Sequence, residues 1–216
     1  MARKGLGGPT DPQGSMVVLP TDEPLAASIL AAAVQVFGSR GYHGTKVSDI
    51  AAAAGVSPGS LYNYFDSKQD VLSTILQRAI DVMLAATEMA FFHADPDPAS
   101  RLKAIVGAVV TTFATEPVIG RIGEIELMQV NPEDRKLIIS KRQAEQRIFD
   151  RVIEDGVNRG VFKLELPRYT SLFVVSACVG VGSWFDPGGR DSVEQVVGRY
   201  QRMALSTVGY GVFEAE

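Results

Sequence analysis

The sequence contains very little cysteine, histidine or tryptophan: one cysteine, two histidines and one tryptophan among 216 residues. The single Cys178 cannot form an intramolecular disulfide, and we expect it to be a small buried hydrophobic residue. His43 and His93 have no carboxylate or cysteine at helical spacing, so we predict surface or loop histidines and no metal site. A nucleophile with a neighbouring base is not evident either. The sequence therefore predicts no catalytic residue, no cofactor and no enzymatic activity.

Long apolar runs are also lacking. The longest strongly apolar stretch, residues 171–185, is shorter than the roughly 20 residues that span a bilayer, and Gly180 and Gly182 interrupt it. Residues 5–13 form a polar run rich in glycine and proline, where a secretory signal would have an apolar core. We therefore predict no membrane span and a cytoplasmic location.

An excess of positive charge is absent as well, because the net charge is -4 at pH 7. This value argues against a generally polybasic nucleic-acid binder. Within residues 24–70 the charges balance, with Arg40, Lys46 and Lys68 against Asp49, Asp66 and Asp70. Any contact with DNA must therefore be local and must use a few well-placed cations, hydroxyls and backbone amides.

Apolar residues recur at helical spacing along most of the chain. Residues 1–22 lack any such period and are rich in glycine and proline, so we expect a flexible arm. Leu25, Ile29, Ala33 and Phe37 recur every four residues and predict a first helix that ends at residues 38–41. Later periodic segments predict helices at 99–115, 117–130, 132–159, 167–185 and 192–212. No segment alternates as a strand, and the sequence predicts an all-α fold of about nine helices.

Residues 45–65 have the pattern of two short helices joined by a glycine turn. Thr45 stands at the expected N-cap of the first helix, which Gly55 ends. Ser57 is expected to cap the second helix with Pro58 at its first position, and Leu61 and Phe65 lie one turn apart on its inner face. We therefore predict a helix-turn-helix.

A long helix is predicted to follow this unit. Ser67 is its expected N-cap, with Asp70 as the acidic partner of a capping box. The helix runs to about His93, before two prolines. Its predicted inward stripe is Val71, Leu72, Ile75, Ala79, Val82, Met83, Ala86 and Met89.

The second short helix has the properties of a recognition helix, which must be short and must enter the major groove end-on. With Leu61 and Phe65 turned inward, Pro58, Gly59, Ser60, Tyr62 and Asn63 are predicted to read bases. The hydroxyls of Ser57, Ser60 and Tyr64 are predicted to meet phosphates. The N-termini of the two helices that follow Thr45 and Ser67 carry partial positive charge. Lys46 and Lys68 each add a full positive charge beside one of these N-termini.

This segment resembles a known family, over nearly all of residues 25–76. It is similar to the N-terminal signature of the TetR family of transcriptional regulators at Gly41-Tyr42, Thr45, Asp49-Ile50-Ala51, Ala54-Gly55-Val56-Ser57, Gly59-Ser60-Leu61-Tyr62, Tyr64-Phe65 and Ser67-Lys68. The resemblance implies that Thr45, Tyr64 and Lys68 contact phosphates and that residues 57–63 read bases. Asn63 departs from the aromatic residue or histidine that is usual there, so the operator sequence does not carry over.

The rest of the chain is predicted to bind ligand and to form a homodimer. We divide the chain into an arm (1–22), a DNA-binding domain (23–68) and a ligand-binding and dimerisation domain (69–216). The resemblance implies a dimer seam of the last two long helices, residues 167–212. The last helix supports a seam with the three-four spacing of Val193, Val196, Val197, Tyr200, Ala204, Thr207 and Val208. Ser176, Gly180 and Gly182 are small enough for close helix approach. A two-fold dimer implies an approximately palindromic operator.

The ligand prediction depends on weaker signals. Residues 124–135 and 184–189 have some likeness to TetR members that respond to acyl-coenzyme A thioesters. The predicted ligand-binding residues are Met83, Phe113, Glu124, Met128, Arg142 and Trp184. The basic row on helix 132–159 is either a solvated face or an anion site; it consists of Arg135, Lys136, Lys141, Arg142, Arg147 and Arg151.

The leading functional hypothesis is a repressor that a small hydrophobic effector, such as an acyl-coenzyme A thioester, releases from its operator. The alternatives are a regulator of efflux or catabolism that answers a drug-like or aromatic ligand, and an activator. Two further hypotheses are a DNA-binding protein without ligand sensing, and a helical enzyme or acyl-carrier module.

Overall fold

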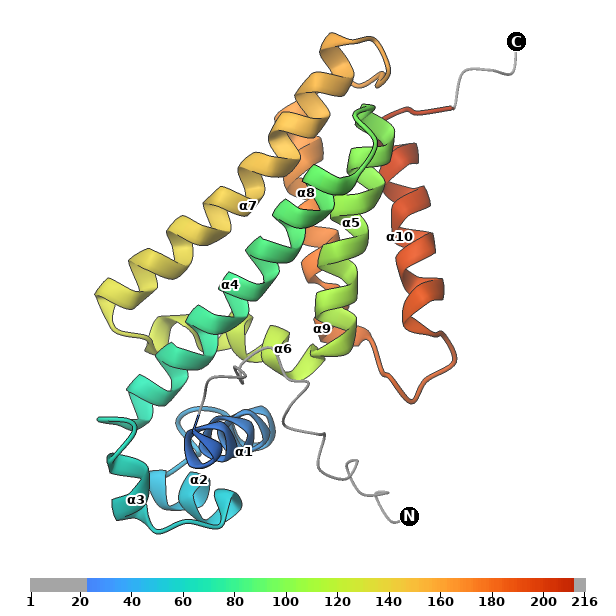
Figure 1. The fold of residues 1–216 in the computed structure, drawn as a ribbon. Helices are drawn as coiled ribbons and strands as arrows, with labels where there is room; N and C mark the ends of the chain where they lie inside the picture. The colour runs from blue at the N-terminus through green and yellow to red at the C-terminus, as the bar shows by residue number, and fades with distance from the viewer. Residues whose placement is uncertain (1–22, 212–216) are drawn as a thin grey trace.

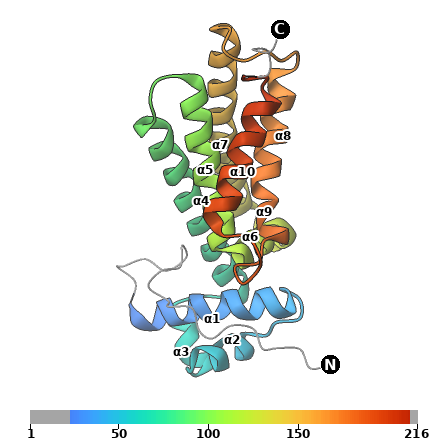
Figure 2. The same cartoon turned by 90° about the vertical axis from the view of Figure 1, so that its right-hand side faces the viewer.

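The computed structural model describes residues 23–211, and these residues form helices and connecting loops without a strand. The all-α prediction is confirmed. The predicted arm, residues 1–22, lies outside the described residues. A small layer at one end holds α1 (Pro24–Arg40), α2 (Val47–Ala54) and α3 (Pro58–Tyr62), and α1 runs crosswise beneath the larger bundle (Figures 1 and 2).

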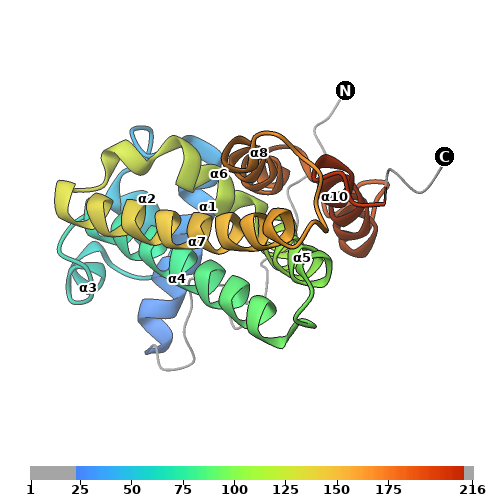
Figure 3. The ribbon, with the colours of Figure 1, turned by 90° about the horizontal axis from the view of Figure 1, so that it is seen from above.

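The larger bundle is built around two long helices. They are α4 (Lys68–His93), which leads out of the small layer, and α7 (Pro132–Asn158), which runs beside it (Figures 1 and 3). The other elements are α5 (Pro98–Thr115), α6 (Pro117–Ile125), the short 3-10 helix η2 (Leu127–Gln129), α8 (Pro167–Val179), α9 (Val181–Trp184) and α10 (Val193–Thr207). The single helix predicted for 167–185 is therefore wrong, because the chain breaks at Gly180 into α8 and α9.

Side-chain caps define several helix starts, among them the predicted caps Ser57 and Ser67. The side chains of Ser57, Ser67, Asn131 and Ser192 each accept a hydrogen bond from a backbone amide in the first turn of their helix. Such caps satisfy amides that have no partner within the helix. The predicted N-cap Thr45 is wrong: α2 is capped at Lys46, whose backbone amide donates to the Asp49 carboxylate at 2.8 Å.

The core of the small layer continues into the larger bundle. Buried Ile29, Phe37, Ile50 and Leu61 belong to the same apolar cluster as residues of α6 and α7, among them Ile119, Ile122 and Ile138. Helices α1 and α6 cross closely at Gly38, where a side chain would overlap Val118. Because these contacts are apolar and buried, a displacement of α6 must also displace α1.

The inward face of α4 differs from its predicted stripe. Val71, Leu72, Ile75 and Met83 are buried, but Val82 and Met89 are exposed. Their places in the core are taken by Ile80, Thr87 and Phe91. The long helix packs against α1, α5, α6 and α7, so it is covered by several helices rather than by one.

The predicted dimer stripe of α10 is used within the protomer. Val196, Ala204 and Val208 are buried in a second core cluster with residues of α5, and Val193, Val197 and Tyr200 pack against that cluster. The small Gly182 likewise faces Gly120 of α6 and the ring of Phe113. The close approach that this glycine permits is therefore intramolecular, and for the buried Val196, Ala204 and Val208 the predicted contact with a partner subunit is wrong.

A different apolar surface remains uncovered on α8. Tyr169, Leu172 and Phe173 are exposed there, although their size makes them typical of buried positions. Met203 on the neighbouring α10 is exposed as well, and the two helices lie side by side on one face of the bundle (Figure 2). We call Tyr169, Leu172, Phe173 and Met203 the α8/α10 face.

The described helices were also compared with the requirements of a membrane span. Within residues 23–211, no single helix is both long and apolar enough to cross a bilayer. Helices α5 and α6 meet the criterion only as a pair, across a bend of 93°.

Candidate nucleic-acid interface and ligand cavity

Helix α3 presents a small polar surface that a buried leucine fixes in place. Leu61 is fully buried, whereas Pro58, Gly59 and Asn63 are exposed and Tyr62 is 52% exposed. This placement matches the predicted division between inner and outer faces. Ser60 is half-buried, and its backbone amide and hydroxyl both bond the Ser57 hydroxyl, at 3.1 and 2.9 Å. The two serine hydroxyls therefore hold the start of the helix in shape before any DNA is bound.

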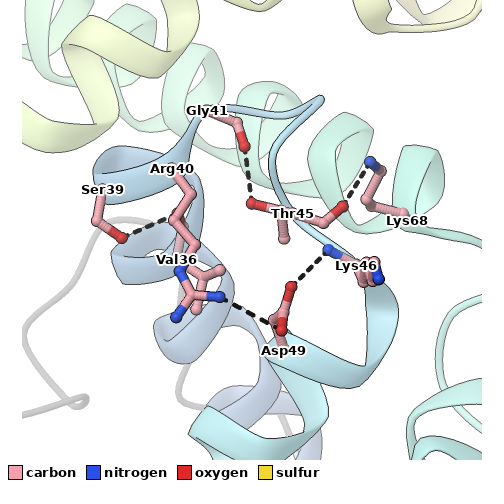
Figure 4. A network of polar contacts seen from close by, with 8 residues as sticks. All are labelled: Val36, Ser39, Arg40, Gly41, Thr45, Lys46, Asp49 and Lys68. Carbon is pink, nitrogen blue, oxygen red and sulfur yellow. Dashed lines mark hydrogen bonds and ion pairs between the residues drawn. The ribbon is translucent and has the colours of Figure 1, made fainter.

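The loop between α1 and α2 is held by the side chain of Lys68, at the start of α4. The Lys68 ammonium donates to the backbone carbonyls of Tyr42 and Thr45, each at 2.7 Å, and lies 4.0 Å from the centre of the Tyr42 ring. Figure 4 shows Lys68 reaching the Thr45 carbonyl from α4. This side chain, predicted to bind phosphate, thus also joins α4 to the loop that precedes α2.

Thr45 is buried within the same loop. Its hydroxyl donates to the Gly41 carbonyl at 2.7 Å (Figure 4). The neighbouring Lys46 is exposed, and Asp49 of α2 accepts from the Lys46 amide and pairs with Arg40 at 3.3 Å. In this arrangement Lys46 offers a free cationic side chain at the surface, whereas the Thr45 hydroxyl is already bonded.

Tyr64 has a partner that the sequence did not indicate. Its phenolic hydroxyl donates to the carboxylate of Glu23 at 2.8 Å. This hydrogen bond raises the pKa of Tyr64 above its ordinary value. The bond ties the end of α3 to the start of α1, so a phosphate contact by Tyr64 would require the hydroxyl to exchange partners.

His43 is a residue that the prediction of the interface missed. It is exposed, as expected for a loop histidine, and its ring makes an edge contact with Tyr42 at 5.6 Å between centroids. It lines a shallow surface depression together with Thr45, Lys46, Val47, Ser48, Pro58, Tyr62 and Lys68. Proximity to Lys46 and Lys68 in the tertiary structure is the signal that identifies it.

Residues 55–59 also match the spacing Gly-x-Ser-x-Gly of hydrolase nucleophiles. That motif requires a strand before the serine and a helix after it. Here Ser57 follows α2, and its oxygen serves as the N-cap of α3. The match is therefore explained by helix capping.

The larger bundle contains a partly open cavity of about 250 Å³ between α4, α5, α6, α7 and α8. Four of the predicted ligand residues, Met83, Phe113, Glu124 and Arg142, line it. Met128 and Trp184 do not: they are 69% and 53% exposed. Met128 lies on η2 beside Arg135, and Trp184 stacks on Tyr200 outside the cavity. Their assignment to the pocket is wrong. The prediction failed because an apolar residue type alone does not distinguish a cavity wall from the protein surface.

Charged side chains lie on the mostly apolar cavity wall. Glu145 of α7 is only 2% exposed and accepts a hydrogen bond from Thr87 of α4 at 3.2 Å. Burial raises the pKa of Glu145 to about 7, against the opposing effects of Thr87 and Arg142. The Arg142 guanidinium donates to the Gly123 carbonyl of α6 at 3.0 Å. Burial also lowers the pKa of Arg142.

We expect the buried Glu145 to make stability depend on pH. The folded protein holds this proton up to about pH 7, whereas the ordinary pKa is 4.5. Between these pH values the folded state binds more protons, so its stability falls as pH rises. The free energy of unfolding should decrease by up to about 3 kcal/mol across this window. In urea titrations at several pH values, Glu145→Gln should remove this part of the dependence. Parallel wild-type and variant curves would contradict the assignment.

The cavity is connected to the α1–α2 loop through α6. Ile119, Gly120, Gly123 and Glu124 of α6 line the cavity. Immediately after this helix, buried Glu126 accepts a hydrogen bond from the Tyr42 backbone amide at 2.8 Å. A second link joins the Gln69 side chain of α4 to the Gln129 carbonyl at 2.6 Å. One short segment therefore carries both a part of the cavity wall and hydrogen bonds to the α1–α2 loop and to α4.

A helix-turn-helix joined by such links to a helical domain with a partly open cavity defines a one-component DNA-binding regulator. The chain belongs to the TetR family of bacterial transcriptional regulators. Residues 29–75 match the family model "Bacterial regulatory proteins, tetR family", and residues 95–208 match the model "Tetracyclin repressor-like, C-terminal domain". Regulators of this family bind operator DNA and dimerise, so the function of this chain is sequence-specific regulation of transcription.

Individual relatives agree with this assignment. The HTH-type transcriptional repressor KstR2 of Rhodococcus jostii (strain RHA1) is 28% identical over 180 residues, which cover 82% of this chain and 87% of the relative. The fatty acid metabolism regulator protein of Bacillus subtilis (strain 168) is 27% identical over 140 residues, covering 65% and 72%. A solved TetR-family regulator from Rhodococcus RHA1 superposes with a TM-score of 0.82 at 32% identity, covering 88% of this chain and all of that one.

Proposed function

We propose that this regulator is a dimeric repressor, and that a small apolar effector entering the cavity releases it from an approximately palindromic operator. The observation that carries the proposal is the hydrogen bond between Glu126 and the Tyr42 amide, which joins the segment bounding the cavity to the loop beside α2. An effector shifts the equilibrium only if it binds one arrangement of α6 more tightly than the other. By this proposal, the same bond transmits a displacement of α6 to the loop beside the DNA-binding residues.

The proposed effector is the acyl part of a coenzyme A thioester or a compound of similar size. A cavity of about 250 Å³ lies below the roughly 300–1,000 Å³ of sites for drug-sized ligands. It suits an acyl chain or a small ring system, while the coenzyme part would remain outside. The name of the relative from Bacillus subtilis, a fatty acid metabolism regulator, supports this class. A drug-like aromatic effector is the second candidate, since Phe113 and Met83 line the wall.

The proposed DNA contacts form two groups, according to whether the contacting groups are exposed or already make hydrogen bonds within the protein. Lys46, Tyr62 and Asn63 are exposed and ready to bind, with Pro58 and Gly59 as close-approach positions. Ser57, Ser60, Thr45 and Tyr64 would contact phosphate through groups that already make internal hydrogen bonds. We propose residues 23–68 as the DNA-binding domain, residues from 69 onward as the sensing and dimerisation domain, and the cytoplasm as the location.

The test begins with selection of bound duplexes from a random DNA library, followed by mobility shifts with the selected operator. We expect a palindromic site with half-sites about one helical turn apart or a multiple of it. Acyl-coenzyme A thioesters with short, medium and long chains should weaken binding about 5- to 150-fold for the matching chain. Free coenzyme A is the control. If neither thioesters nor aromatic compounds change operator affinity, the proposed release mechanism is wrong.

The link through Glu126 predicts a matched pair of variants. Glu126→Ala removes the acceptor of the Tyr42 amide, and we expect operator affinity without effector to fall about tenfold, because a hydrogen bond to a charged group contributes roughly 1.5–3 kcal/mol. Glu126→Gln retains an acceptor oxygen and should stay within about threefold of the wild type by the same reasoning. Mobility shifts measure both variants. Equal affinities for the alanine variant and the wild type would contradict the proposed coupling.

A further inference from the structure

The carboxyl group of Glu145 is the most buried charged group of the cavity wall, and its hydrogen-bonding capacity is mostly unused. A carboxylate can accept about four hydrogen bonds. Within residues 23–211, its one hydrogen bond comes from the Thr87 hydroxyl at 3.2 Å. That hydroxyl has a single proton, and its oxygen also lies 2.9 Å from the Met83 carbonyl oxygen, to which it donates. Glu145 therefore receives at most a shared hydrogen bond.

Burying such a group is unfavourable unless a partner satisfies it. An unsatisfied charged group in an apolar environment costs several kcal/mol, or shifts its pKa. The pKa of Glu145 is raised to about 7, which is the expected sign of a carboxylate without sufficient partners. The nearby Arg142 attracts the carboxylate, but within residues 23–211 no hydrogen bond or ion pair joins the two side chains, and the guanidinium donates instead to the Gly123 carbonyl.

The charges of the cavity select the kind of partner that is missing. Among the described lining residues, Glu116, Glu124 and Glu145 carry carboxyl groups and Arg142 is the one cation. An anionic group inside the cavity would be repelled by this lining. A group that donates a hydrogen bond, with or without a positive charge, would be attracted to Glu145.

We propose that the effector is an apolar molecule with one hydrogen-bond donor, a hydroxyl or an ammonium group, and that this donor binds the carboxyl group of Glu145. The inference rests on the proposed function, since it assumes that the cavity is the effector site. The apolar part of the effector packs against side chains such as Leu76, Ile80 and Val179. A thioester fits this description when its acyl chain or ring carries a hydroxyl group.

Four probes with the same bicyclic skeleton test the assignment: indane, 2-indanone, 2-indanol and 2-aminoindane. Their binding to the full-length protein is measured by calorimetry at pH 8, above the pKa of about 7 at which Glu145 loses its proton, so that its carboxylate only accepts hydrogen bonds. We expect 2-indanol, 2-aminoindane or both to bind about 10- to 100-fold more tightly than indane and 2-indanone, as a hydrogen bond to a charged group predicts. If indane or 2-indanone binds as tightly as both donors, or if neither donor binds at millimolar concentration, the assignment is wrong.

Two substitutions of Glu145 separate the two kinds of donor. Glu145→Leu removes every acceptor and should abolish the preference for donors. Glu145→Gln retains an acceptor oxygen without charge, so it should preserve part of the binding of the alcohol and lose that of the amine. Thr112→Val is the matched control, because Thr112 lines the same cavity but bonds the Ala108 carbonyl of its own helix. Thermal unfolding verifies that each variant is folded.

Failure of this inference is distinguishable from failure of the proposed function. Donor binding that depends on Glu145, without any effect on the selected operator, supports the assignment of Glu145 and contradicts release by this cavity. Operator release by all four probes alike supports the release mechanism and contradicts the role of Glu145.

Discussion

Replacing Phe173 with glutamate is expected to convert the dimer into a monomer and to weaken operator binding by about 100-fold or more. Phe173 is 61% exposed and lies with Tyr169 and Leu172 on the α8/α10 face. Large apolar side chains clustered at the surface mark an interaction site, and a buried unpaired carboxylate there would oppose association. Loss of the dimer removes the second DNA-binding domain, whose linkage contributes about 10²–10⁴ in avidity.

The measurements are the molar mass by light scattering and the affinity for the selected palindromic operator. Phe92→Glu is the matched control, because Phe92 is also an exposed phenylalanine but belongs to α4, a helix that lies across the bundle from α8 (Figures 2 and 3). This variant should remain dimeric and bind the operator normally. A dimeric Phe173→Glu protein, or a monomeric Phe92→Glu protein, would show that dimerisation uses another surface.

Lys68→Met is expected to weaken operator binding about ten- to hundredfold and to lower the free energy of unfolding by about 2 kcal/mol. The variant retains the apolar stem but loses the bonds to the Tyr42 and Thr45 carbonyls and the contact with the Tyr42 ring. If Lys68 also neutralises a phosphate, the slope of binding against salt concentration should decrease by about one. The experiments are mobility shifts at several salt concentrations and urea unfolding.

Lys46→Met provides the comparison. Lys46 is exposed, so its loss should reduce the salt slope in the same way while stability changes by less than about 0.5 kcal/mol. Unchanged affinity and salt slope in Lys68→Met would exclude it as a phosphate contact. A loss of stability without a change in salt slope would identify Lys68 as a purely structural residue.

Much of the fold could be predicted because its signals are local. Capping serines and Asn131 define helix starts through bonds to amides two or three residues away. Apolar spacing likewise located Leu61 on the inner face of α3 and thereby the exposure of Tyr62 and Asn63. These interactions join residues within one turn of helix, so they can be predicted from the spacing of residues in the sequence.

The use of each apolar face was decided only by packing. The stripe of α10 could have met a partner subunit or another helix of the same chain, and in the structure it meets α5. The pattern of spacing is identical in both cases, since it reports burial without naming the partner. Met128 and Trp184 illustrate the same limit, because both lie at the surface rather than in the cavity.

The sequence by itself determined the class of the protein, its all-α fold and the starts of several of its helices. Tertiary structure alone decided the polar contacts between residues far apart in the chain. The Glu126 carboxylate bonds the Tyr42 amide across 84 positions, and Glu145 meets Thr87 across 58. No local propensity encodes such pairs, because each depends on how two distant helices cross, and that crossing is fixed by the packing of the whole core.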